Sequence, residues 1–226
     1  MHPHRETLSR RTFVGQTVGA AAVLALPDAS QATEIAPSAE QFVQANVLRL
    51  LALMANTTAP TERQRLDLSA LLESFIAFDR VGLFVLGRYA GHARQNPALR
   101  DAWISAFKDY AVASYEIRLN RFRGGLHRVT GSATRLPNQD VIVSSQFYGG
   151  ALTEPVDFGW RVVRSADVWT VFDLQVRLEG GQIWLAQQQQ AEILSELDRN
   201  NGDLADLTTQ VARTTARIRS TVRGMH

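Results

Sequence analysis

The fold is decided by the stretch Phe78-Asp79-Arg80-Val81-Gly82-Leu83-Phe84-Val85-Leu86-Gly87-Arg88-Tyr89. Residues 81–91 are expected to form one helix whose apolar side chains point nearly all round its axis, so it must be covered on several sides. Glycine at position 87 destabilises a helix relative to alanine, so its presence indicates that a backbone or a ligand packs closely against it. We interpret Asp79 as the N-cap of this helix, with a buried acid as the alternative.

Helices are also expected on both sides of this stretch. Residues 40–55 carry an apolar stripe at helical spacing, and Thr61 can cap a second helix. The apolar positions of this second helix are Leu68, Leu71, Leu72 and Phe75. After the stretch, Pro97 stands in the first turn of a helix rich in aromatic side chains. The helix of the opening stretch and the aromatic helix after it need a broad apolar partner, which the second half of the chain supplies as a sheet.

In the second half of the chain, the apolar residues recur with the two-residue period of β-strands. The runs that predict strands are residues 126–136, 140–148, 155–164 and 168–177. Their short connections favour an antiparallel meander with one strongly apolar face. In the last run, simple alternation places Trp169, Val171 and Asp173 on one face, and Phe172 and Leu174 on the other.

The chain is expected to finish with two helices. Residues 179–181 are expected to end the sheet, and residues 184–199 then read as a glutamine-rich helix that stops at Asn200-Asn201-Gly202. Asp203 can cap the last helix. The sequence therefore predicts an α+β fold, with helices packed on one face of a curved four-stranded antiparallel sheet.

The N-terminus is typical of an export signal. Ser9-Arg10-Arg11-Thr12-Phe13-Val14 precedes a moderately apolar run that is too short to span a membrane. Small residues follow in Ser30-Gln31-Ala32, so residues 1–32 are interpreted as a twin-arginine leader cleaved after Ala32. Residues 33–226 would then form one domain.

Composition excludes several classes of function. The formal net charge is +2, and the predicted leader carries three arginines against two acids, which leaves +1 for the mature chain. No arginine-rich run interleaved with aromatic residues follows, so nucleic acid is not expected as a partner. The chain has no cysteine, which rules out disulfides and thiolate chemistry.

Candidate catalytic residues are few. No two histidines have metal-ligand spacing, no phosphate loop or nucleophile elbow occurs, and neither metal nor cofactor is expected. His127 could act as a base oriented by Asp173, but two half-exposed strand residues are the simpler interpretation. The chain is instead rich in aromatic residues, which could form an ordinary core or line a cavity for an apolar ligand.

Several motifs resemble one known family. They are the opening stretch, Trp103-Ile104-Ser105-Ala106-Phe107-Lys108-Asp109-Tyr110 with Ser114-Tyr115, Val156-Asp157-Phe158-Gly159-Trp160-Arg161-Val162, and Trp169-Thr170-Val171-Phe172-Asp173-Leu174. The pattern resembles the MlaC or toluene-tolerance family, the periplasmic phospholipid-binding component of a lipid-transport ABC system. The segment Arg177-Leu178-Glu179-Gly180-Gly181-Gln182-Ile183-Trp184 departs from the family pattern, because it has extra residues and lacks the usual serine.

The resemblance implies an NTF2-like domain whose sheet and helices enclose acyl chains. It implies a monomeric, non-catalytic periplasmic carrier of phospholipid, or of a polycyclic lipid such as a hopanoid. Its partners would be an inner-membrane ABC complex and an outer-membrane lipoprotein complex. The expected lipid-binding residues are Phe84, Val85, Leu86, Tyr89, Trp103, Phe107, Tyr110, Phe147, Phe158, Trp160, Phe172 and Leu174. The alternatives are an NTF2-like isomerase or dehydratase using His127 and Asp173, and an interaction module of the transporter.

Overall fold

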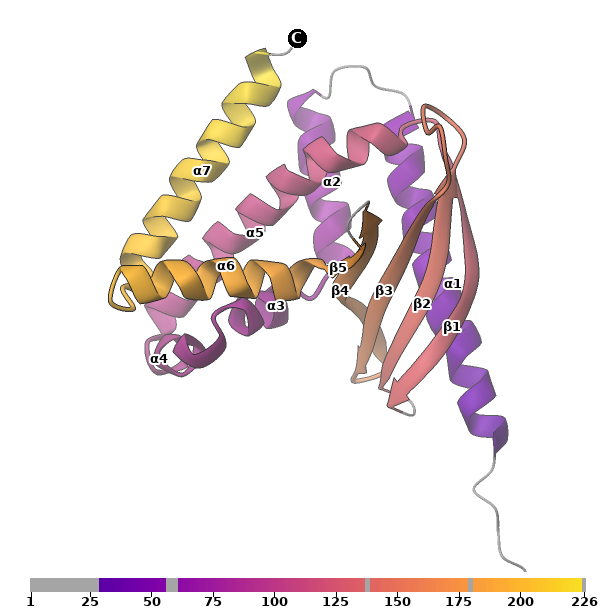
Figure 1. The fold of residues 1–226 in the computed structure, drawn as a ribbon, viewed down its shortest axis with the longest axis horizontal. Coiled ribbons are helices and arrows are strands. Elements are labelled where there is room, and N and C mark those ends of the chain that lie inside the picture. The colour runs from indigo at the N-terminus through magenta and orange to yellow at the C-terminus, as the bar shows by residue number, and fades with distance from the viewer. Residues whose placement is uncertain (1–28, 56–60, 137–138, 179–180, 225–226) are drawn as a thin grey trace, which may run out of the picture.

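The structure is a computed structural model that describes residues 29–55, 61–136, 139–178 and 181–224 (Figure 1). The predicted leader lies mostly outside these ranges, and the first helix begins at Ala29, ahead of the predicted cleavage point. The α-helices are α1 (Ala29–Ala55), α2 (Glu62–Phe75), α3 (Phe78–Val85), α4 (Ala90–Gln95), α5 (Pro97–Leu119), α6 (Leu185–Arg199) and α7 (Leu204–Gly224). Two 3₁₀ turns are η1 (Gly87–Tyr89) and η2 (Asn120–Phe122). The strands are β1 (Leu126–Leu136), β2 (Asp140–Tyr148), β3 (Val156–Ser165), β4 (Val168–Leu178) and β5 (Gly181–Trp184).

The predicted α+β class and the antiparallel meander are confirmed, with the strands in the order β1-β2-β3-β4-β5. The predicted number of strands was wrong, because the sheet does not end at residues 179–181. Gly181–Trp184 turns back along β4, and Ile183 pairs with Val176. The segment that departs from the family pattern therefore closes the sheet with a short fifth strand, and α6 begins at Leu185.

A β-bulge at Phe172 corrects the predicted alternation of β4. Arg161 of β3 pairs with Asp173, but the next residue, Val162, pairs with Val171, so Phe172 is an extra residue in β4. Before the bulge, Val171 shares the inner face with Val162. After it, Leu174 takes that face, opposite Trp160, and Asp173 pairs with Arg161. The simple alternation, which placed Val171 and Asp173 together, was wrong beyond Val171.

Local capping residues fix three helix starts where they were predicted. Thr61 forms a capping box with Gln64 at the start of α2. Asn96 accepts a hydrogen bond from the amide of Leu99, one residue before Pro97 opens α5. Asp203 accepts from the amide of Asp206 at the start of α7. These ends follow from local chemistry alone.

The single helix predicted for residues 81–91 is broken at Gly87. Gly87 has a φ of +51°, a left-handed conformation that ends α3 and starts the turn η1. A Cβ atom there would lie 3.1 Å from Leu194 of α6, so the predicted close packing at this glycine is confirmed. The N-cap prediction for Asp79 was wrong, because α3 already begins at Phe78 and Asp79 lies exposed in its first turn.

The core lies between the helices and the inner face of the sheet. α1 packs along β1 and β2, whereas α2, α3 and α6 meet β4 (Figure 1). α5 is central to the helical layer and carries the fully buried side chains of Trp103 and Phe107. The indole Nε1 of Trp103 donates to the carbonyl of Gly82, which joins α5 to α3. α7 packs along α5, on the side away from the sheet.

Candidate functional site

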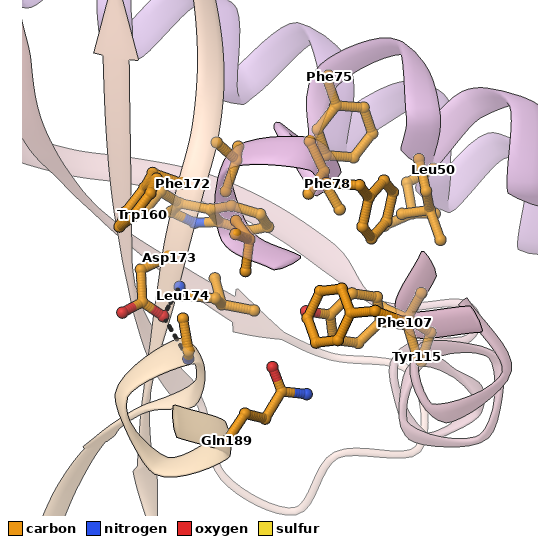
Figure 2. A pocket seen from close by; sticks show the side chains of 16 residues that line it. Leu50, Phe75, Phe78, Phe107, Tyr115, Trp160, Phe172, Asp173, Leu174 and Gln189 are labelled. Carbon is orange, nitrogen blue, oxygen red and sulfur yellow. Dashed lines mark hydrogen bonds between the residues drawn. The ribbon is translucent and has the colours of Figure 1, made fainter. Parts of the chain in front are cut away.

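A cavity lies where the helices meet strands β3 and β4 (Figure 2). It contains about 620 Å³ of unfilled space, including the space at its open mouth. Its walls are apolar except for a carboxylate, an amide and a phenol hydroxyl. The lining residues are Leu50, Leu72, Phe75, Ile76, Phe78, Val81, Phe107, Tyr115, Leu119, Trp160, Val171, Phe172, Asp173, Leu174, Ala186 and Gln189.

The cavity exists because elements far apart in sequence converge on the bulged part of β4. Ile76, between α2 and α3, forms a bridge with Val171, and the amide of Ala77 donates to the Val171 carbonyl. On the other side, the carboxylate of Asp173 accepts hydrogen bonds from the amides of Leu174 and Ala186, each at 2.8 Å. β4 thus holds the α2–α3 junction at one point and the start of α6 at another, and the cavity opens between them.

Four of the predicted lipid-binding residues line this cavity: Phe107, Trp160, Phe172 and Leu174. Phe84 stands next to it, because its ring meets that of Phe172 edge to face at 5.3 Å.

The other predicted residues lie elsewhere. Val85, Leu86 and Trp103 are buried in the hydrophobic core. The hydroxyl of Tyr89 donates a hydrogen bond to the carboxylate of Asp198 in α6. Tyr110 lines a neighbouring space between α5, α6 and α7.

Phe147 and Phe158 belong to a group of rings outside the cavity lining, which we call the ring cluster and define as Phe122, His127, Phe147 and Phe158. Its ring centroids lie 4.8 to 5.4 Å apart, from Phe122 to Phe147, Phe122 to Phe158, Phe147 to Phe158 and His127 to Phe147. This side of the inner face is filled by its own rings.

Sequence reasoning missed several cavity residues. Phe75 and Phe78 bracket the α2–α3 junction, and Tyr115 faces them from α5 (Figure 2). Phe75 belonged to a recognised apolar stripe, but a stripe does not tell which of its members border open space. Tyr115 was part of the Ser114-Tyr115 motif that supported the family resemblance, and this motif was the signal in the sequence that could have identified it.

Two polar groups of the cavity, the buried Asp173 and the partly buried Tyr115, have shifted pKa values. Burial raises the pKa of Asp173, against the hydrogen bonds from the Ala186 and Leu174 amides. Its second oxygen, Oδ2, has no hydrogen-bond partner among the described residues. Burial also raises the pKa of Tyr115 to about 12, and the charge of Asp173 adds to this shift. Asp173 and Tyr115 are therefore two polar side chains within an otherwise apolar cavity wall.

His127 and Asp173 do not form the base-and-orienter pair considered from sequence. They lie on β1 and β4 with two strands between them, about 14 Å apart at ordinary strand spacing. The Nδ1 of His127 lies 3.0 Å from the Gln44 side-chain oxygen, and its ring packs on Phe147. Burial lowers the pKa of His127 to about 4, so the ring is neutral at pH 7. Its surroundings are those of a core residue.

The described part of the chain gives no sign of a metal centre or a membrane span. Among residues 29–55, 61–136, 139–178 and 181–224, no three histidine, aspartate or glutamate side chains group as a metal site. Within the same ranges, no helix combines the length and apolar character needed to cross a bilayer.

Comparisons with known proteins agree with this architecture. The phospholipid-binding protein from Ralstonia solanacearum, solved in complex with a phospholipid, matches with a TM-score of 0.67 at 19% sequence identity. The match covers 80% of this chain and 98% of that one. No curated protein sequence matches significantly. The sequence profile of the MlaC protein family matches residues 43–213, which include all the residues that line the cavity. The chain therefore belongs to the MlaC family.

Proposed function

We propose that this protein is a periplasmic carrier that binds a phospholipid, or a lipid of similar apolar bulk, in the cavity beside β4. It shuttles this lipid between an inner-membrane ABC complex and an outer-membrane lipoprotein complex, and works as a monomer. Membership of the MlaC family supports the proposal, as does the fold shared with a protein that was solved with a phospholipid.

One observation carries the proposal: a largely apolar cavity opens between the helices and β4, with about 620 Å³ of unfilled space when its mouth is included. Protein interiors are normally filled to the density of organic crystals. An unfilled space lined by Phe75, Phe78 and Leu174 leaves those side chains without partner atoms on one side. An apolar ligand supplies the missing contacts.

The energetics explain why such a carrier is needed. A lipid with about 30 methylene groups, at roughly 0.8 kcal/mol each, cannot cross an aqueous compartment unaided. Apolar contact tolerates different chain geometries, so selectivity among head groups should be weak. A rigid polycyclic lipid such as a hopanoid would suit the aromatic walls as well.

The arrangement gives less support to the two alternatives. An NTF2-like enzyme would need His127 and Asp173 to meet in one pocket, but they are separated by two strands. An interaction module would need no open apolar space, whereas the space beside β4 is open.

Export through the predicted leader is part of the proposal. The first core residue among those described is Ala39, beyond the predicted cleavage point after Ala32. Cleavage there would leave every residue of the described core in place. N-terminal sequencing of the secreted protein should begin at Thr33, and a product that begins within the described core would contradict this part.

The decisive experiment is mass spectrometry of the organic extract from protein purified without detergent. Wild-type protein should carry lipid in stoichiometric amount. Leu174→Arg places a charge in the cavity wall, where an unpaired charge is strongly disfavoured beside acyl chains, and should abolish loading.

The matched control is Leu136→Arg, the same exchange at a strand leucine that is 57% exposed and lies outside the cavity. It should carry as much lipid as the wild type. Circular dichroism checks that both variants are folded. Empty wild-type protein, or a folded Leu174→Arg protein that still carries lipid, would overturn the proposal.

A further inference from the structure

A second space lies next to the cavity, between α5, α6 and α7. It contains about 650 Å³, including its open side. Its apolar wall includes Tyr110, Ile193, Leu207 and Val211, while Glu192 and Glu196 are among its polar lining residues. A chain-like apolar ligand could lie on this wall, because the two carboxylates remain partly or fully exposed to water.

Two residues line both spaces: Phe107 of α5 and Gln189 of α6. Figure 2 shows Gln189 reaching from α6 toward Phe107 and Tyr115. The two spaces are therefore neighbours with a shared wall that consists of one aromatic ring and one amide side chain.

The two halves of this wall differ in how firmly they are held. Phe107 is 1% exposed, its ring packs 5.8 Å from that of Trp103, and a Cβ atom on Gly82 would lie 3.3 Å from it. The amide of Gln189 has no hydrogen bond to any described residue, whereas the next residue, Gln190, donates to the Phe84 carbonyl at 2.6 Å. Gln189 is thus the part of the wall that can rotate away.

Volume gives a reason for the two spaces to join. A methylene group is about the size of a water molecule, whose share of liquid volume is about 30 Å³, so a chain of sixteen carbons needs roughly 480 Å³. The cavity beside β4 has about 620 Å³ even with the open space at its mouth included, which is less than the roughly 960 Å³ that two such chains need. The second space, at about 650 Å³ with its open side included, is an apolar space that directly adjoins this cavity.

We propose that the space between α5, α6 and α7 receives the second acyl chain of the bound lipid, and that the side chain of Gln189 is the gate between the two chambers. This inference rests on the proposed lipid-carrier function. It adds that the two chains of the lipid occupy separate chambers.

The test fills the second chamber and leaves the first untouched. Thr214 of α7 lines the second chamber only, so Thr214→Trp should block it. The matched control is Thr209→Trp on the exposed side of the same helix, because both threonine hydroxyls donate to the carbonyl four residues earlier. Binding is measured for dipalmitoyl phosphatidylglycerol and for its single-chain lysophospholipid, with the full-length protein and both variants.

Thr214→Trp should weaken binding of the two-chain lipid by at least about tenfold, the change expected when only two methylene groups stay in water. Its binding of the single-chain lipid should stay within about twofold of the wild type. Thr209→Trp should match the wild type with both lipids. Equal binding of the two-chain lipid by Thr214→Trp and wild type, or an equal loss of both lipids, would overturn the two-chamber proposal.

A second variant tests the gate itself and does not depend on α7. Gln189→Trp should close the passage and weaken binding of the two-chain lipid more than binding of the single-chain lipid, because Gln189 lines both chambers. Gln187→Trp, at an exposed position on the same helix, is its control. Unchanged binding by Gln189→Trp would refute the gate. If wild-type protein binds neither lipid, the carrier function itself fails, which is a different result from the failure of the two-chamber proposal.

Discussion

The inner face of the sheet carries aromatic side chains on both sides of β3, but the two regions are packed differently. On the β1–β2 side, the ring cluster of Phe122, His127, Phe147 and Phe158 fills its space ring against ring. On the β4 side, rings of the same kind surround an open cavity. An abundance of aromatic residues therefore does not by itself distinguish a core from a binding site.

The difference lies in what covers each region. α1 lies along β1 and β2, and the turn η2 brings Phe122 directly onto the rings of Phe147 and Phe158. α6 instead touches the sheet mainly at its start, where Asp173 holds the Ala186 amide, and then extends away from the strands across α3 (Figure 1). A helix that crosses the sheet edge in this way leaves space beneath it.

The largest expected effect comes from emptying part of the filled region. Phe147 is 1% exposed and contacts three other rings, so Phe147→Ala should destabilise the protein by about 3–5 kcal/mol. Urea unfolding followed by circular dichroism measures this. A loss below about 1 kcal/mol would mean that the ring cluster can collapse around the missing ring.

The counterpart is Phe78→Ala at the cavity wall. Phe78 is 5% exposed, but one side of its ring already faces unfilled space, so fewer contacts are lost. The loss of stability should be clearly smaller than for Phe147→Ala in delipidated protein. An equal loss would remove the distinction between the two regions.

Acid should weaken the filled region through His127. Its folded pKa of about 4 lies below the ordinary 6.5, so the unfolded chain binds more protons between these values. Stability is therefore lost as pH falls from about 6.5 to about 4, by roughly 3 kcal/mol in all.

The variant that isolates this effect is His127→Phe, which cannot titrate. Between pH 7 and pH 4, the wild type should lose roughly 3 kcal/mol more unfolding free energy than His127→Phe does. A pH-independent difference would show that His127 keeps an ordinary pKa in the folded protein.

Much of the fold could be predicted because local chemistry determines it. Thr61, Pro97 and Asp203 mark helix starts through their own side chains or ring, and the strands β1 and β2 were predicted at the residues where they occur. The corrections fall where tertiary contacts override local pattern. Gly87 breaks the predicted helix with a positive φ at the point where Leu194 of α6 packs against it, and residues 181–184 form a strand by pairing with β4.

The candidate site was less predictable than the fold. Trp160 and Phe147 look alike in sequence, since both are inward-facing aromatic residues on apolar strands, yet only Trp160 borders the cavity. The bulge at Phe172 decides which face Asp173 and Leu174 take, and no residue type in the strand announces it. Cavity lining is a property of the space between elements, which periodicity does not describe.

The smallest expected effect concerns the link that holds the cavity open, the carboxylate of Asp173. Asp173→Ala leaves the amides of Leu174 and Ala186 without their acceptor and should cost about 1–3 kcal/mol. Asp173→Asn keeps an acceptor oxygen and should cost less. Because burial raises the pKa of Asp173, ionisation costs the folded state stability as pH rises, so the asparagine variant should gain on the wild type between pH 3.5 and pH 7. Urea unfolding at both pH values measures the change. If the wild type instead gains stability relative to the asparagine variant over this pH range, the Asp173 charge is stabilised in the folded protein. The carboxylate would then do more at this edge of the cavity than accept hydrogen bonds from two amides.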